Sequence, residues 1–297
     1  MDEDGVTVFV PGHVTGFFST HPDDDPTKAG SRGAGLTLSD GVTVTLSPAA
    51  TTRMTLNGTE ITVEPVERVC EALSISARIE ATADLPLGAG FGVSGALSLG
   101  SALAANHVFE RRLSENELIT IAHVAEVRSG TGLGDVVAQA KGGVPIRLDP
   151  GGPDHNHLDA IPASTRIEYL TFGDLSTESI LSGDTERLTD AGLQSLSILG
   201  EEPTLSTLLY ASRRFAREAG LLTDRVQAVI EDISALGGEA SMAMLGQTVF
   251  ALDSGLSEAG YDPAVCHTHA AGASILNEPA IPTATARASR ANNAGDL

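Results

Sequence analysis

A glycine-rich segment carries the clearest chemical signal in this sequence. It reads Pro-Leu-Gly-Ala-Gly-Phe-Gly-Val-Ser-Gly-Ala over residues 86–96, between a predicted strand and a predicted helix. Such a loop exposes backbone N–H groups and directs a helix N-terminus at one point, which favours a bound anion. We therefore predict a phosphate site made by Pro86, Gly88, Ala89, Gly90, Phe91, Gly92, Val93, Ser94, Gly95 and Ala96.

Two common phosphate-binding motifs explain this loop poorly. Gly90, Gly92 and Gly95 spell G-x-G-x-x-G, and Glu110 lies near the offset of a ribose-binding acid. That dinucleotide-binding match is weak, because the preceding strand alternates apolar with polar residues instead of being continuously apolar. A Walker A loop is excluded, because it needs a lysine and none lies nearby.

The loop resembles that of the GHMP kinases (galactokinase, homoserine, mevalonate and phosphomevalonate kinases), whose pattern is P-x-x-x-G-L-G-S-S-A. Pro86, Gly90, Gly92 and Ser94 match it, while Phe91 and Val93 depart from it. Residues 10–18 are similar to the family's A-P-G-K-V segment with His13 in place of lysine, and residues 130–135 are similar to the segment with its catalytic aspartate. These matches cover about the first 145 residues, whereas the C-terminal glycine-rich motif is poorly matched at residues 242–250.

The departures resemble one branch of the family, the archaeal pantoate kinases. They are His13, the Val-Ser-Gly form of the phosphate loop, the segment at residues 30–35 and the Met-Leu-Gly-Gln-Thr-Val-Phe run that ends at Phe250. This resemblance implies ATP-dependent phosphorylation of a small molecule, pantoate, to 4-phosphopantoate in coenzyme A synthesis, with ATP and Mg²⁺ as cofactors. Two alternatives stay open: a GHMP kinase for mevalonate or homoserine, and a non-catalytic ligand sensor with this fold.

The resemblance also implies residue roles. Asp135 would be the catalytic group that accepts or orients the proton of the substrate hydroxyl, and His13 would be a second catalytic residue that donates a hydrogen bond. Ser94 and Glu126 would bind Mg²⁺, which takes one or two protein oxygens beside a nucleotide. The structural alternatives are helix N-caps for Ser94 and Asp135, a solvated helix carboxylate for Glu126 and a turn residue for His13.

Arg32 is the best local candidate for binding the substrate carboxylate. It lies in the Ser-Arg-Gly run at residues 31–33, and a guanidinium group matches a carboxylate through two parallel hydrogen bonds. Ser31 and Thr15 are weaker candidates for substrate binding. The alternative for Arg32 is an exposed loop arginine without a ligand.

The elements that must position these residues indicate an α+β protein. Strand patterns occupy residues 6–10, 36–46, 54–63 and 75–81, with tight turns expected at Asp40-Gly41 and Asn57-Gly58. Helices are expected at 66–73, 94–105, 114–127, 203–219 and 224–236, and further strands at 144–148, 166–172 and 247–252. Ser114 and Glu117 have the spacing of a capping box.

The family resemblance implies a two-domain fold. Residues 1–150 would form an N-terminal β-rich α/β domain of the ribosomal protein S5 domain 2-like type that contains the phosphate-binding loop. Residues 151–281 would form a C-terminal ferredoxin-like α/β domain. We expect residues 282–297, which are rich in Ala, Thr, Arg and Asn without periodicity, to be a disordered tail.

The composition limits the partners and the surroundings of the protein. The 297 residues have a net charge of −21, which argues against binding to nucleic acid or to an anionic membrane. Lysine occurs only at positions 28 and 141, so we interpret the acidic surface as adaptation to high salt. Signal and membrane-spanning patterns are absent, so we expect a cytoplasmic protein, and a homodimer is compatible with the sequence.

Overall fold

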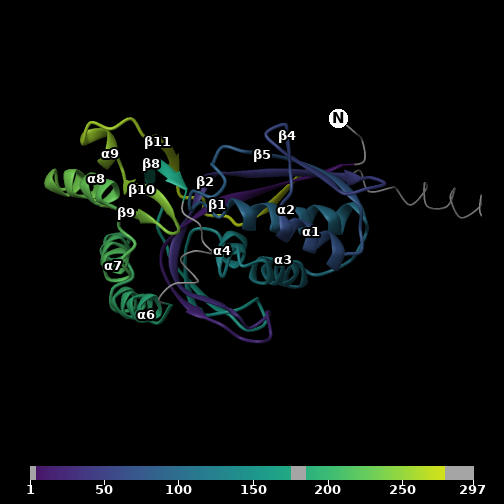
Figure 1. Ribbon diagram of the computed structural model, residues 1–297, viewed down its shortest axis with the longest axis horizontal. Helices are drawn as coiled ribbons and strands as arrows, with labels where there is room; N and C mark the ends of the chain where they lie inside the picture. The colour runs from purple at the N-terminus through teal and green to yellow at the C-terminus, as the bar shows by residue number, and fades with distance from the viewer. Residues whose placement is uncertain (1–4, 175–184, 278–297) are drawn as a thin grey trace, which may run out of the picture.

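Two β-sheets with helices on their faces make up the structure, a computed structural model that describes residues 5–174 and 185–277 (Figure 1). The tail predicted at 282–297 lies outside the described residues. The eight-stranded sheet has the order β12-β1-β2-β5-β3-β4, with β6 paired to β2 and β7 paired to β6. Its strands are β1 (Val6–His21), β2 (Gly30–Pro48), β3 (Arg53–Leu56), β4 (Thr59–Ile61), β5 (Ala77–Ala83), β6 (Val144–Asp149), β7 (His157–Ile161) and β12 (Ser274–Asn277).

Four helices lie on one face of this sheet: α1 (Glu64–Ala72), α2 (Val93–Val108), α3 (Glu115–Ser129) and α4 (Asp135–Lys141) (Figure 1). The predictions of the first three are confirmed, as is the capping box of Ser114 and Glu117 at the start of α3. The small residues of α2 let it pack tightly on the sheet, since a Cβ atom at Gly100 would lie 2.8 Å from Val44 Cγ2. The phosphate loop at its N-terminus is therefore fixed to a rigid core element.

Of the two predicted tight turns, one is confirmed and one is wrong. Asn57 and Gly58 have φ angles of 50° and 79° and connect β3 to β4 as predicted. At Asp40 and Gly41 there is no hairpin, because β2 continues through them and forms a bulge where its pairing with β1 shifts. Gly41 is there for close approach rather than for a turn, since a Cβ atom would lie 2.3 Å from the Val10 carbonyl oxygen.

The second sheet has four antiparallel strands in the order β11-β8-β10-β9. Its strands are β8 (Arg166–Asp174), β9 (Ala240–Ala243), β10 (Gly246–Leu252) and β11 (Ala264–His267), and the helices α7 (Leu205–Glu218), α8 (Asp224–Ala235) and α9 (Gly255–Glu258) pack against it (Figure 1). Helix α6 (Thr185–Glu201) packs on α7 and on β1 and β2 of the first sheet. The predicted elements in this part are confirmed. The sequence analysis missed α6, because its buried face includes Gly192 and Ser195, which weaken the apolar pattern.

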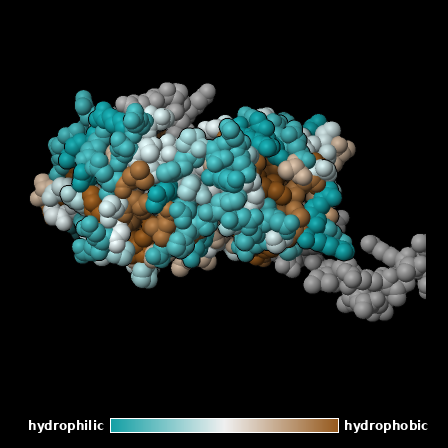
Figure 2. All heavy atoms as spheres, turned by 90° about the horizontal axis from the view of Figure 1, so that it is seen from below, coloured by the Kyte–Doolittle hydropathy of each residue, from teal (hydrophilic) through white to brown (hydrophobic). Residues whose placement is uncertain are grey.

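These elements confirm the α+β class. Strands from both sides of residue 150 join the eight-stranded sheet, since β7 pairs with β6 and β12 pairs with β1. The domain division near residue 150 stays a prediction. None of the described helices is long and apolar enough to cross a membrane. The face in Figure 2 is mostly hydrophilic, with separate hydrophobic areas, as expected for a folded chain that keeps most apolar side chains in its core.

Candidate active site

A cavity of about 580 Å³ lies at the N-terminus of α2. Parts of the chain far apart in sequence form its walls, namely β1, β2, the phosphate loop, the loop before α4, β6 and the segment before β10. The predicted site residues that line it are Thr15, Ser31, Gly88, Gly90, Phe91, Gly92, Val93, Ser94, Gly95, Glu126 and Asp135. Pro86, Ala89, Ala96, His13 and Arg32 lie outside this lining.

The phosphate loop needs its glycines. Gly88, Gly90 and Gly92 have φ angles of 84°, 88° and 63°, in the left-handed region that other residues rarely adopt. Gly92 is the N-cap of α2, so Ser94 lies inside the first turn and does not cap the helix. The loop backbone and the positive end of the α2 dipole face one end of the cavity, which is the arrangement that an anion requires.

A buried carboxylate lies beside this loop. Glu126 is 2% exposed, its Oε1 accepts hydrogen bonds from Ser94 Oγ at 2.7 Å and Ser98 Oγ at 3.0 Å, and its Oε2 accepts one from Thr131 Oγ1 at 2.8 Å. Burial raises the pKa of Glu126 to about 6, although the three hydroxyl groups oppose this shift. A carboxylate and a hydroxyl that line the same cavity are oxygen ligands of the kind that Mg²⁺ takes, so Glu126 and Ser94 fit this ion.

A second carboxylate is paired with a histidine. The imidazole of His13 is fully buried, and its Nδ1–H donates to Asp135 Oδ1 at 2.7 Å. Asp135 is the first residue of α4, and the helix cap is Gly134, so the carboxylate is free of the capping role. Burial favours a higher pKa for Asp135, but the hydrogen bond and charge of His13 and the charge of Arg147 together lower it. Asp135 is therefore ionised at neutral pH and able to accept a proton.

The sequence analysis missed Arg147 on β6. This arginine is 1% exposed and lines the cavity near Asp135, whose negative charge acts on it. Its Nε and Nη1 atoms have no hydrogen-bond partner in the part of the chain that the structure describes. Burial lowers the pKa of Arg147 to about 10, which leaves it charged at neutral pH. An arginine at a buried position of a predicted strand is the signal that could have identified it.

Arg32 points away from the cavity. Ser31 lines it, and neighbouring residues of a strand project from opposite faces, so the side chain of Arg32 lies on the other face of β2. There its charge acts on His21 rather than on Asp135. Thr15 and Ser31 line the same cavity as Arg147. The structure thus brings together every predicted substrate-binding residue except the arginine.

Comparisons with known proteins agree with this geometry. The model of the GHMP kinases N terminal domain matches residues 60–143. The chain is 34% identical to a pantoate kinase of Methanocaldococcus jannaschii over 82% of this chain and 92% of that one. It is also 34% identical to a pantoate kinase of Methanospirillum hungatei over 85% and 89% of the two chains.

A solved structure extends the likeness to three dimensions. A phosphotransferase related to the CoA biosynthesis pathway superposes with a TM-score of 0.82 at 28% identity, over 91% of this chain and 98% of that chain. The similarity to this structure and to the sequence relatives therefore extends over both sheets and is not limited to the phosphate loop. The chain therefore belongs to the GHMP kinases and, within them, to the pantoate kinase family.

Proposed function

We propose that this protein transfers the γ-phosphoryl group of ATP to the terminal hydroxyl group of pantoate and releases 4-phosphopantoate and ADP. The observation that carries the proposal is one cavity that holds an anion-binding loop, an ionised Asp135 and the buried guanidinium group of Arg147, whose Nε and Nη1 atoms have no partner among the described residues. Full-length relatives that are pantoate kinases support this choice of substrate.

The phosphate loop would bind the triphosphate. Phosphoryl transfer requires alignment of the two substrates and neutralisation of negative charge on the phosphates. Backbone N–H groups from Gly88 to Gly92 supply part of that neutralisation. Ser94 and Glu126 would hold Mg²⁺, which supplies positive charge to the phosphate oxygens when bound. The adenine end of the nucleotide would lie where Val63, Pro65 and Leu87 line the cavity.

Asp135 would orient and deprotonate the attacking hydroxyl. Its carboxylate accepts the proton of the pantoate 4-hydroxyl as the new O–P bond forms and the bond between the γ-phosphorus and the leaving ADP oxygen breaks. His13 holds Oδ1 of this carboxylate at 2.7 Å, which leaves the other oxygen to face the substrate. The hydrogen bond from His13 thus fixes the carboxylate and keeps it ionised.

Arg147 would bind the substrate carboxylate. Two nitrogen atoms of its buried guanidinium group have no partner in the described part of the chain, which is costly without an anionic ligand, and a carboxylate matches the planar geometry of this group. Arg147 and Asp135 line the same cavity, so a short substrate with a carboxylate at one end and a hydroxyl at the other would contact both. Ser31 and Thr15 would donate or accept hydrogen bonds along its length.

A panel of acceptors tests the proposal. We expect ADP release with Mg-ATP in molar KCl to be much faster with pantoate than with pantothenate, mevalonate or homoserine, and we expect EDTA to abolish it. Phosphorus NMR of the product should show a monoester on the terminal oxygen. Equal or faster turnover of mevalonate or homoserine would contradict the choice of substrate, and a metal-independent rate would contradict the roles of Ser94 and Glu126.

A further inference from the structure

The carbonyl groups of the phosphate loop are held by donors from outside the loop. A loop binds phosphate only if its N–H groups face the ligand and its carbonyl oxygens, which carry partial negative charge, face elsewhere. Ala89 O accepts from Thr248 Oγ1 at 2.9 Å, Phe91 O accepts from the His13 backbone N–H at 2.9 Å, and Gly92 O accepts from Gln139 Nε2 at 2.9 Å. Three different elements therefore restrain the loop.

Thr248 brings the second sheet to the loop. It is a fully buried residue of β10, outside the cavity lining, and its hydroxyl lies 3.1 Å from Thr171 Oγ1 on β8. Because the Ala89 oxygen can only accept, Thr248 must donate to it and can accept from Thr171. The approach is close, since a Cβ atom at Gly246 would lie 2.1 Å from Ala89 O. This contact fixes the direction of one loop carbonyl.

Gln139, on α4, contacts the phosphate loop from a different element. It is fully buried, lies outside the cavity lining and is four residues after Asp135, so the two side chains share one face of the helix. Its amide donates to Gly92 O, the carbonyl of the residue that caps α2, which also accepts the Ala96 backbone N–H at 3.0 Å. A single helix face therefore carries both Asp135 and a support for the phosphate loop.

We propose that Thr248 and Gln139 are positioning residues that hold the loop carbonyls away from the nucleotide phosphates and so raise the affinity for ATP. The inference rests on the proposed function only for the identity of the anion as a nucleotide phosphate. Neither side chain touches the substrates. Loss of Thr248 frees Ala89 O to rotate toward the phosphates, where it would repel them. Loss of Gln139 leaves Gly92 O with only the Ala96 backbone N–H as a donor, so this carbonyl can tilt toward the phosphates but is not freed.

Binding of MgADP by calorimetry, together with steady-state kinetics, tests the role of Thr248. Thr248→Val keeps the shape and removes the donor, so we expect a dissociation constant and a KM for ATP about 5- to 10-fold higher, the effect of one lost hydrogen bond. The KM for pantoate should stay within twofold. Thr248→Ser keeps the hydroxyl and should restore binding. Ser195→Ala, which removes a buried hydroxyl that donates to Ala211 O, is the matched control and should leave nucleotide binding unchanged.

Gln139→Met provides a second variant in another element. Because Gly92 O keeps its bond from the Ala96 backbone N–H, this variant should raise the dissociation constant of MgADP less than Thr248→Val does, by about threefold. Thermal melting verifies its folding. If either variant folds and binds MgADP within twofold of the wild type, the positioning role of that residue is wrong, whatever the acceptor substrate. If the wild-type protein itself binds neither MgADP nor MgATP, the proposed function fails first.

Discussion

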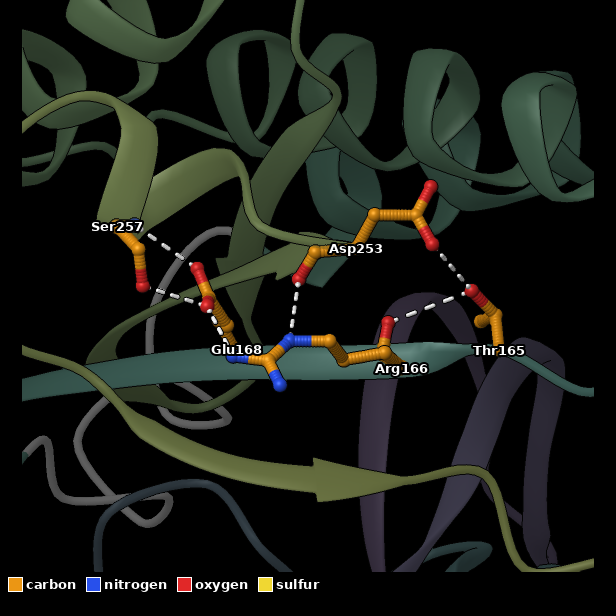
Figure 3. Close-up of polar contacts among 5 residues, drawn as sticks. All are labelled: Thr165, Arg166, Glu168, Asp253 and Ser257. Atoms are coloured by element: carbon orange, nitrogen blue, oxygen red, sulfur yellow. Dashed lines mark hydrogen bonds and ion pairs between the residues drawn. The ribbon is translucent and has the colours of Figure 1, made fainter.

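Two clusters of this molecule combine a carboxylate with an arginine, and they differ in whether their polar atoms have partners. In the second sheet, Glu168 accepts hydrogen bonds from Arg166 Nη2 at 2.7 Å and from the backbone N–H and the Oγ of Ser257 at 2.9 and 2.6 Å (Figure 3). Arg166 Nε donates to the Asp253 carbonyl at 3.3 Å. This cluster ties β8 to the turn after β10 and to α9.

The cluster in the cavity is satisfied only in part. Asp135 has His13 as a partner, but His13 Nε2 and the Nε and Nη1 atoms of Arg147 have none within the described residues. Buried polar groups are nearly always hydrogen-bonded, and a group that is not needs a functional explanation. The comparison indicates that the Glu168 cluster serves the fold and that the Asp135 cluster is completed by a ligand. Variants in the Asp135 cluster should therefore lower activity with little loss of stability, and variants in the Glu168 cluster should lower stability with little loss of activity.

Asp135→Asn should give the largest change. Because the amide cannot accept the proton of the attacking hydroxyl, we expect kcat to fall by about 10² to 10⁴, the range for general acid–base groups. Nucleotide affinity and melting temperature should change little. The exposed Asp154→Asn is the control and should keep full activity. A normal kcat in Asp135→Asn would reduce this residue to a structural partner of His13.

Arg147→Met should give the next largest change. Loss of a charge-assisted pair with the substrate carboxylate should raise the KM for pantoate by about 10- to 100-fold, with a smaller effect on kcat. The variant should be as stable as the wild type or more stable, since the gain from removing a buried guanidinium group, two of whose nitrogen atoms lack partners among the described residues, offsets the lost attraction to Asp135. Steady-state kinetics and thermal melts measure both effects.

Arg32→Ala is the matched comparison for Arg147. Because its side chain lies on the other face of β2, we expect the KM for pantoate to rise less than about threefold. That is a smaller rise than the loss of a hydrogen bond to a charged group would cause. If the KM for pantoate rises more in Arg32→Ala than in Arg147→Met, Arg32 binds the substrate carboxylate, as the sequence predicted.

The two arginines show where sequence reasoning stops. The phosphate loop, its glycines and the helix that follows it are local features, so their position was predictable from a short segment. The face of β2 to which Arg32 belongs and the burial of Arg147 depend on strand pairing, in which Gly33 lies opposite Arg147 across more than a hundred residues. The bulge at Asp40 was misread as a turn for the same reason, since only the partner strand β1 distinguishes the two.

Glu168→Gln tests the other cluster. Replacing a carboxylate that accepts three hydrogen bonds should lower the free energy of unfolding by about 1–3 kcal/mol at pH 7 while kcat and both KM values stay unchanged. Burial favours a higher pKa for Glu168, but Arg166 and Ser257 lower it below its ordinary value. Its stabilising contribution is therefore present above the unfolded-state pKa of about 4.3 and is lost as the pH falls through the folded-state pKa.

Denaturant unfolding at pH 7 and at pH 3 measures this difference. The penalty of Glu168→Gln should shrink at the lower pH, where the wild-type carboxyl also becomes protonated. The exposed Glu60→Gln on β4 is the control and should cost little at either pH. A loss of activity in Glu168→Gln without a loss of stability would break the division between the two clusters.

Salt should affect the difference between the two clusters least, although it should raise the stability of the whole molecule. With a net charge of −21, repulsion between surface carboxylates reaches about 30 Å at 0.01 M salt and about 3 Å at 1 M, so the melting temperature should climb with KCl. NaCl should give much of the same gain, because it screens equally. Equal melting temperatures in dilute buffer and in 2 M KCl would contradict the interpretation of the acidic surface as salt adaptation.

The penalty of Glu168→Gln should be nearly independent of this gain. The side chain of Glu168 is fully buried and its partners are held by short hydrogen bonds, so mobile ions screen it far less than they screen surface carboxylates. Arg166 is 40% exposed, and its share of the pair is the part that salt can weaken. We therefore expect the penalty to fall by less than about 0.5 kcal/mol between 0.1 and 2 M KCl, the scale of an exposed ion pair. Loss of the whole penalty in 2 M KCl would mean that charge rather than hydrogen bonding holds this cluster.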